Sequence, residues 1–321
     1  MNTARLRRTA WAVAGLMLAA SGSANALFRT YLSVNGSDAN PCSIAAPCRL
    51  LPAALAAVDA GGEIWMLDSA NFNTSVVSIT KSVTILAVPG QLGSVVGNGG
   101  TAFSISGAGI EVTLQNLNIL SLGGTGDIGV LIGNAGKVQI IDCSIFGFKG
   151  FGNEIGIWIN PDANSPRVSI VGTTVRNNHH GIIASGNAHV TISKSRLLSN
   201  NVSGVWASSG SPNRFVNVVV SDTVSANNAN GYAVTGLASA ATFYSSTMFV
   251  TRSVASGNTS AGFTSDGGIT GLMSVGDSIA ADNATGFNNT GGSGAFMTRG
   301  NNTVTGNSNN TNGTISLFNG V

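Results

Sequence analysis

Residues 168–207 read VSIVGTTVRNNHHGIIASGNAHVTISKSRLLSNNVSGVWA and contain two copies of one pattern. Each copy has an alternating segment, Val168 to Ile170 and then Val190 to Ile192, followed by a Ser or Thr, an aliphatic residue, an Asn-rich turn and a Gly followed by an apolar residue. Alternation with a period of two predicts a strand with one buried face. The unit is therefore a set of short strands and turns.

The same unit recurs along most of the chain. Gly followed by an aliphatic or aromatic residue recurs at steps of 23 to 31 residues, at Gly129, Gly156, Gly181, Gly204, Gly231, Gly262 and Gly286. Self-similarity at such a period is typical of repeat architectures. Propeller blades need about 40 residues and the leucine-rich consensus is absent, so a stack of parallel β-coils fits best.

A column of small residues follows each alternating segment. It lies three residues after the last apolar position and consists of Cys143, Thr173, Ser195, Thr223, Ser253 and Ser278. Aliphatic residues flank these positions, so we expect them to form an internal stack. Cys143 fills a place otherwise taken by Ser or Thr, which predicts a buried structural thiol and not a nucleophile.

A second polar column lies four residues before the glycine. Its members are Asn177, Asn200, Asn227, Asn258 and Asp282. Asn tolerates the left-handed backbone of a tight turn, and its amide can bond to the next Asn when identical turns stack about 4.8 Å apart. The column predicts an asparagine ladder.

These columns and the repeat length resemble the right-handed parallel β-helix proteins, the group with the pectin lyase fold. The resemblance covers about residues 62 to 318 and implies an all-β, single-stranded right-handed parallel β-helix solenoid. Members of this group often begin with a capping helix. A helical face between Pro47 and Asp59, ended by Gly61 and Gly62, predicts such a helix here.

The chain divides into three predicted segments. Residues 1–26 combine a basic start, an apolar run of eleven residues and small residues at Ala24 and Ala26, which is typical of a secretory signal peptide. Eleven residues are too few for a membrane span. Residues 27–61 would form an N-terminal strand, a Cys loop and the capping helix, and residues 62–321 about nine coils. The predicted location is periplasmic or extracellular.

Cys42 and Cys48 are close enough in sequence to form a disulfide in an oxidising compartment. A metal site is the alternative, but two thiols with no neighbouring His or further Cys offer too few ligands. We predict the disulfide, no metal and no cofactor.

The charge of the chain limits its partners. Without the three arginines of the signal segment it has 12 Lys and Arg against 13 Asp and Glu, a formal net charge of −1. Only 9% of residues are charged. Such a surface offers no patch that could neutralise several phosphates, so nucleic acid and anionic membranes are unsuitable partners. No segment after the signal peptide is long and apolar enough to span a membrane.

An outward aromatic stripe is the first candidate site. The second residue after each glycine should point outward, and this position holds Trp158, Ile183 and Trp206 on three consecutive coils. Two indoles two coils apart could stack on sugar rings of a polysaccharide or cell-surface glycan. Alternatively, the loop at residues 160–166 or a second copy of the chain covers the stripe, because exposed apolar patches often mark interfaces.

Glu154, His179 and His180 form a weaker candidate. Glu154 and His179 fall in register on adjacent coils, and a carboxylate beside an imidazole could act as acid and base. The alternative is a solvated polar turn. Lys194 and Arg196 could also face a substrate.

The resemblance implies catalytic motifs that can be looked for in this sequence. Pectate-lyase-like members use calcium-binding acids with an Arg, polygalacturonase-like members use Asp residues with an Arg-x-Lys tripeptide, and pectin esterases use a Gly-Arg-Pro-Trp motif. None of these motifs occurs here. The sequence favours a secreted, non-catalytic β-helix that binds polysaccharide or a cell-surface partner through the stripe. The alternative is a polysaccharide lyase or glycoside hydrolase acting on an acidic polysaccharide.

Overall fold

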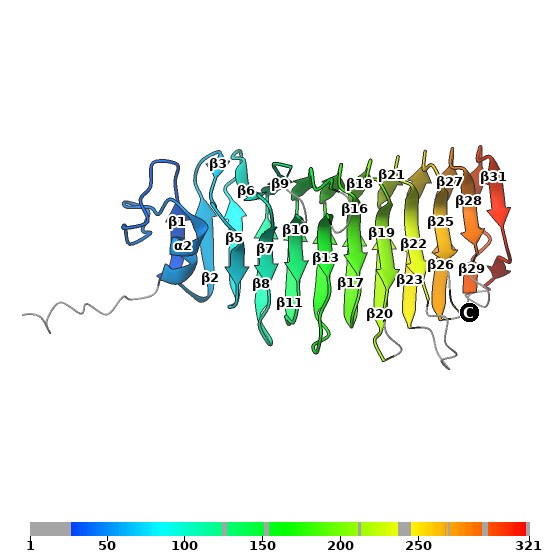
Figure 1. Ribbon diagram of the computed structural model, residues 1–321, viewed down its shortest axis with the longest axis horizontal. Coiled ribbons are helices and arrows are strands. Elements are labelled where there is room, and N and C mark those ends of the chain that lie inside the picture. Colours follow the sequence, from blue (N-terminus) through cyan, green and yellow to red (C-terminus); the bar gives the residue numbers. More distant parts are fainter. Residues whose placement is uncertain are drawn as a thin grey trace, which may run out of the picture.

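The chain winds into an elongated right-handed parallel β-helix (Figure 1). The computed structural model describes residues 27–123, 127–150, 154–210, 213–236, 245–266, 268, 270–290 and 295–318. The predicted signal peptide lies outside these ranges. Every pair of neighbouring strands in the sheets is parallel, because each coil returns to the same sheets one step further along the stack. The predicted fold class is confirmed.

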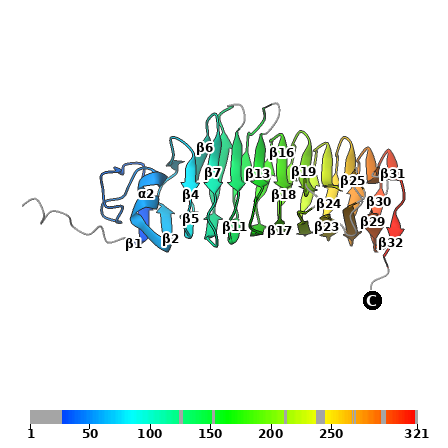
Figure 2. The same cartoon turned by 60° about the horizontal axis from the view of Figure 1, so that its bottom comes forward.

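Three parallel sheets form the faces of the solenoid (Figure 2). Sheet 1 has 12 strands: β1 (Leu27–Leu32), β2 (Val58–Met66), β5 (Val83–Ala87), β8 (Glu111–Gln115), β11 (Lys137–Ile141), β14 (Arg167–Val171), β17 (Ala188–Ser193), β20 (Val216–Ser221), β23 (Ser246–Thr251), β26 (Gly271–Gly276), β29 (Ala295–Thr298) and β32 (Ser316–Leu317). Sheet 2 has 10 short strands: β3 (Ala70–Asn71), β6 (Gly93–Gly97), β9 (Leu117–Ser121), β12 (Ser144–Phe146), β15 (Thr174–Arg176), β18 (Arg196–Leu198), β21 (Val224–Ala226), β24 (Val254–Ser256), β27 (Ile279–Ala281) and β30 (Thr303–Thr305). Sheet 3 has 10 strands: β4 (Val77–Ile79), β7 (Thr101–Ile105), β10 (Ile128–Ile132), β13 (Ile155–Ile159), β16 (His180–Ala184), β19 (Ser203–Ser208), β22 (Asn230–Thr235), β25 (Ala261–Asp266), β28 (Thr285–Asn289) and β31 (Asn309–Asn312).

A short helix lies at the N-terminal end of the stack (Figure 1). Helix α2 (Leu51–Ala57) has Pro in its first turn and buries Leu51, Ala54 and Leu55. It is shorter than predicted, because it ends at Ala57 and not at the glycine pair. The backbone turns extended at Val58, which pairs with the first strand across from Leu27, so strand pairing replaces the last helical turn.

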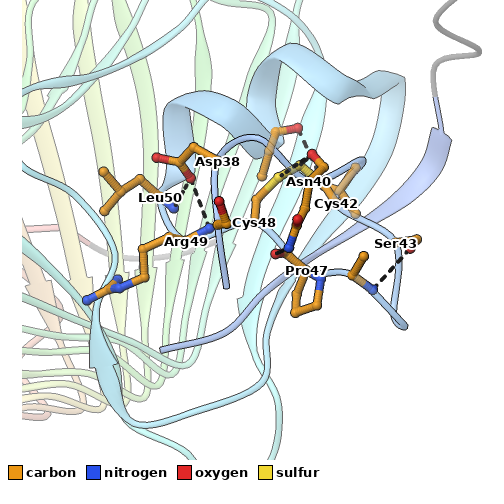
Figure 3. The surroundings of a disulfide bond; sticks show 12 residues. Asp38, Asn40, Cys42, Ser43, Pro47, Cys48, Arg49 and Leu50 are labelled. Carbon is orange, nitrogen blue, oxygen red and sulfur yellow. Dashed lines mark hydrogen bonds between the residues drawn. A yellow bond between two sulfur atoms is a disulfide. The ribbon is translucent and has the colours of Figure 1, made fainter. Parts of the chain in front are cut away.

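The loop before α2 is closed by the predicted disulfide between Cys42 and Cys48 (Figure 3). Asp38 lies in the same loop, and its Oδ1 atom accepts hydrogen bonds from the backbone N–H groups of Arg49 at 2.9 Å and Leu50 at 2.8 Å. The N-cap residue Leu50 makes no side-chain capping bond. The carboxylate therefore satisfies amides beside the helix start that the chain would otherwise leave open.

A buried asparagine ladder runs through the turn between sheets 2 and 3. In each step, one Asn Oδ1 accepts both the backbone N–H and the side-chain Nδ2 of the Asn on the preceding coil, at 2.8 to 3.2 Å. The members are Asn178, Asn200, Asn228, Asn258, Asn283 and Asn307. The ladder exists as predicted, but three of the predicted members are wrong.

Asn177, Asn227 and Asp282 lie one residue before the ladder. Each has a positive φ of 55° to 58°, which turns its side chain away from the interior and aims the next residue inward. The glycine lies three positions after the ladder residue in these coils and four positions after it in the coils of Asn200 and Asn258. A fixed spacing of four therefore selected the wrong residue in three coils.

The predicted stack of small residues forms a second ladder. The N–H groups of Thr173, Thr223 and Ser253 each donate to the hydroxyl on the following coil at 3.2 Å. Cys143 continues this column, and its N–H donates to Thr173 Oγ1 at 3.3 Å. Its thiol is buried, and burial raises the pKa of Cys143 to about 12. The prediction of a structural thiol is confirmed.

We predict that the two adjacent asparagines of one turn differ sharply in their effect on stability. Asn228→Leu removes the acceptor for two buried N–H groups of Asn200, which should cost about 3 kcal/mol of unfolding free energy. Asn227→Gly is the matched control. It keeps the left-handed backbone and removes an exposed side chain, so it should change stability by less than about 0.5 kcal/mol. Urea unfolding measures both, and equal losses would contradict the assignment of the ladder.

Candidate functional site

The outward column of sheet 3 lies in the register that the sequence predicts. Trp158 pairs with Ile183, Ile183 with Trp206, and Trp206 with Ala233 on successive strands. The alternate side chains, such as Ile157 and Ile159, are fully buried. Strand alternation thus puts the two indoles on one face, two coils apart, roughly 10 Å by the spacing of neighbouring strands.

The stripe is less exposed than predicted, because both indoles lean onto the following coil. The indole N–H of Trp158 donates to Ser185 Oγ at 3.1 Å, and that of Trp206 donates to Thr235 Oγ1 at 2.9 Å. Ile183 is only 8% exposed, and its strand is the one that Trp158 crosses. An indole N–H seeks a partner, so each ring lies over a neighbouring strand instead of projecting outward.

A groove of about 450 Å³ runs along sheet 3 from His180 toward the C-terminal end. It crosses β16, β19, β22, β25 and β28, which by strand spacing is roughly 19 Å. The Trp206 indole and Ala233 line it on neighbouring coils, and most of the other lining residues are polar. The lining residues are His180, Val202, Ser203, Trp206, Asn230, Ala233, Thr235, Ser260, Thr264, Asp266, Asn288 and Thr290.

Hydrogen bonds between coils fix the polar side chains of the groove. Asn288 Nδ2 donates to Thr264 Oγ1 at 3.2 Å, and Thr290 Oγ1 donates to Asp266 Oδ1 at 2.8 Å. These side chains occupy the second and fourth positions after each glycine, the outward positions of the strand. The sequence reasoning missed the fourth position, although the same alternation that placed the tryptophans also places it.

His180 joins the edge of the groove to the aromatic column. Its ring stacks on Trp206 with centroids 5.4 Å apart, and its Nδ1 lies 2.9 Å from Ser203 Oγ. The side chain is buried, and desolvation, followed by the nearby His179, lowers the pKa of His180 to about 4. A neutral imidazole therefore helps to hold the indole in place at neutral pH.

Glu154 and His179 lie in register on neighbouring coils, but their side chains contact different residues. Glu154 is 2% exposed, and its carboxylate lies so close to Gly150 that a Cβ there would clash with Oε1. His179 is half-buried at the turn, where its ring meets His180 edge-on with centroids 5.0 Å apart. Neither Glu154 nor His179 lines the groove described above.

Lys194 and Arg196 lie away from the groove. Lys194 occupies the bend between sheets 1 and 2 with a φ of 51°, and Arg196 starts β18 of sheet 2. Both side chains are exposed. Sheet 3 carries the groove, so these two cations face a different side of the solenoid.

Two further observations concern the described ranges as a whole. No cluster of three His, Cys, Asp or Glu side chains with the spacing of a metal site is found in them. No helix within the same ranges has the length and hydropathy of a membrane span.

The buried His180 predicts a pH dependence of stability. Its pKa of about 4 in the folded protein is below the value near 6.5 expected for an unfolded chain, so the unfolded chain binds more protons between these values. The free energy of unfolding should therefore fall as the pH is lowered from about 6.5 toward 4. His180→Phe should flatten this slope, whereas His189→Gln, on an exposed position of sheet 1, should keep it. Urea unfolding at pH 6.5 and 5 provides the comparison, and an unchanged slope in His180→Phe would refute it.

Comparison with solved structures shows the same fold in carbohydrate-active proteins. The pectate lyase Pel9A has a TM-score of 0.59 at 14% sequence identity, with 91% of this chain and 77% of the lyase covered. XylC, solved in complex with xylose, has a TM-score of 0.59 at 9% identity, with coverage of 90% and 70%. The GH136 lacto-N-biosidase from Eubacterium ramulus has a TM-score of 0.54 at 12% identity, with coverage of 90% and 68%. At these identities the likeness shows the fold alone.

Sequence comparison places the repeats in a family. No curated protein matches the chain significantly. The family model for the right-handed β-helix region matches residues 101–279, which is more than half of the chain and includes the tryptophan column and most of the ladder. The chain therefore belongs to the right-handed β-helix family.

Proposed function

We propose that the protein binds a neutral polysaccharide or cell-surface glycan along the groove of sheet 3. The observation that carries this proposal is the combination of a fixed indole at Trp206 with a row of hydroxyl, amide and carboxylate groups on the next coils. Sugar rings offer an apolar face to aromatic side chains and hydroxyls to polar ones. The groove follows the stacking direction, which suits an extended chain of sugars.

The charge of the groove favours a neutral ligand. Asp266 is the one acidic residue among the described lining residues, and the only other titratable side chain there is His180, which is neutral at pH 7. An acidic sugar would meet a carboxylate with no cation beside it in the groove. The names of the structurally similar proteins, a pectate lyase, a lacto-N-biosidase and a protein in complex with xylose, support a carbohydrate as the class of ligand.

Two other readings of this face have less support. Cleavage of an acidic polysaccharide needs an acid and a base at one bond, and Glu154 is directed to Gly150 while His180 packs on Trp206. Self-association through the stripe needs exposed apolar area, and Ile183 is buried.

Export by the signal peptide to the periplasm or the medium remains part of the proposal, because polysaccharides are found there.

The tryptophans provide the test. Trp206→Ala should weaken binding to a neutral polysaccharide by about tenfold, which corresponds to about 1.4 kcal/mol, because the stacking platform is lost. Trp65→Ala is the matched control, since Trp65 belongs to sheet 1 and packs against Arg29. Titration calorimetry against xylan, galactan and β-glucan measures the affinities, and the release of reducing ends from the same panel tests cleavage.

Several outcomes would overturn the proposal. Equal affinity of the wild type and Trp206→Ala would remove the groove as the site, and no binding to any neutral glycan would remove the ligand class. Release of reducing ends that disappears in His179→Ala would replace binding with catalysis at the turn of β16.

A further inference from the structure

Charged residues of alternating sign lie at the bend between sheets 1 and 2. In four consecutive coils the residue after the sheet 1 strand is charged and exposed, and its φ is 45° to 51°. The strands before these residues pair in register, so the four side chains follow one another at strand spacing, about 4.8 Å. In chain order this charge column consists of Lys194, Asp222, Arg252 and Asp277.

The two inner members of the charge column form an ion pair, and the two outer members do not. Arg252 donates from Nε and Nη2 to the two carboxylate oxygens of Asp222, at 2.9 and 3.0 Å. Within the described ranges Lys194 and Asp277 take part in no ion pair, and Asp277 Oδ1 accepts a hydrogen bond from Asn301 at 2.6 Å. The column thus has a positive end and a negative end, and its reverse carries the opposite sign at every position.

The outer face of sheet 2 begins two residues after the charge column and is mostly apolar. Its strands follow one another along the upper edge of the solenoid in Figure 1. Parallel sheets are usually covered on both faces, and exposed apolar patches often mark interfaces. Ile279 is 42% exposed here, and the other apolar residues are partly exposed. From β18 to β27 the apolar outward positions are Leu198, Val224, Ala226, Val254, Ile279 and Ala281.

We propose that this face of sheet 2 binds a second copy of the chain, with the two solenoids antiparallel. A two-fold axis parallel to the strands, between the coils of Asp222 and Arg252, lays the charge column against its own reverse. Lys194 then faces the partner's Asp277, and Asp222 faces the partner's Arg252. A two-fold axis along the solenoid would instead put the two columns on opposite sides of the interface. Charge complementarity therefore favours the antiparallel pair.

The size of this face predicts a weak, reversible dimer. The strands from β15 to β30 and the bend beside them cover on the order of 400 Å² per copy by strand spacing and rise. A standard protein interface buries about 800 Å² per partner. The dimer should therefore form only at high protein concentration. It uses sheet 2, so the inference does not depend on the proposed glycan groove of sheet 3.

Sedimentation equilibrium of the full chain, without glycan, tests the proposal. Raising the salt from about 50 to about 500 mM should weaken the dimer, because salt screens exposed charges. Lys194→Glu places a carboxylate opposite the partner's Asp277, twice in a symmetric dimer, and should weaken dimerisation at least tenfold. Lys137→Glu is the matched control, since it makes the same change at an exposed position of sheet 1 and should dimerise like the wild type.

An exchange of charges provides the sharper test of the arrangement. Asp277→Lys alone should also weaken the dimer. The double variant Lys194→Glu, Asp277→Lys should restore dimerisation to within about threefold of the wild type, because opposite signs face each other again. Val254→Lys tests the apolar face apart from the charge column and should weaken dimerisation at least tenfold. Urea unfolding shows whether each variant is folded.

The contrary outcomes are distinct. A monomer at millimolar concentration would overturn the proposal, as would a dimer that is unaffected by both Lys194→Glu and Val254→Lys. Weakening in each single charge variant without recovery in the double variant would overturn the antiparallel arrangement. Trp206→Ala should dimerise like the wild type, because Trp206 belongs to sheet 3. Loss of glycan binding in that variant therefore tests the groove alone.

Discussion

The hydrogen bond from one asparagine to the next, buried in the turn between sheets 2 and 3, fixes how each coil sits on its neighbour. In each step one carbonyl oxygen accepts two N–H groups of the preceding coil, so a coil displaced by one residue would leave buried polar groups without partners. The second ladder of Ser and Thr adds the same constraint at the bend between sheets 1 and 2. Two bends per coil are thereby fixed, and the strands between them can stay short.

This constraint decides what the surface displays. Since the register cannot slip, an outward residue on one coil faces the equivalent residue on the next, and chemical character builds up in columns. Sheet 3 collects Trp206 and polar side chains into a nearly neutral groove, whereas the outward column of sheet 1 contains Lys137 and Arg167 on neighbouring coils. The two faces of one solenoid therefore differ in charge and polarity.

The sequence alone predicted the fold because the repeat signals are local. The period of the glycines, the alternation of each strand and the Ser and Thr column each depend on a few adjacent residues, and so does the Cys42 and Cys48 pair. The ladder was misplaced at Asn177 and Asn227 because both stand in Asn-Asn doublets, and only the backbone φ tells which of the two turns inward. At Asp282 the ladder residue is the next one, Asn283, which lies only three positions before the glycine, so the fixed spacing of four again selected the residue before the ladder.

The candidate sites were harder to predict, because they depend on how side chains lean. The alternation of the strands placed Trp158, Ile183 and Trp206 in one outward column. The hydrogen bonds of the two indole N–H groups, which hold the rings over the next coil, have no signature in the sequence. Glu154 shows the same limit, since register placed it correctly but its side chain turns toward Gly150. The column of Lys137, Arg167 and His189 on sheet 1 could have been found by aligning the first outward position of each strand.

Hydrogen exchange at the ladder tests the central claim most directly. The backbone N–H groups of Asn200, Asn228 and Asn258 lie in turns, yet each donates to a buried side-chain oxygen on the next coil. These three amides should therefore exchange as slowly as amides in the middle of the sheet 1 strands, and they should be protected together. Exchange at the rate of open, solvated turns would show that the coils are not joined through these residues, and the columns on both faces would lose their basis.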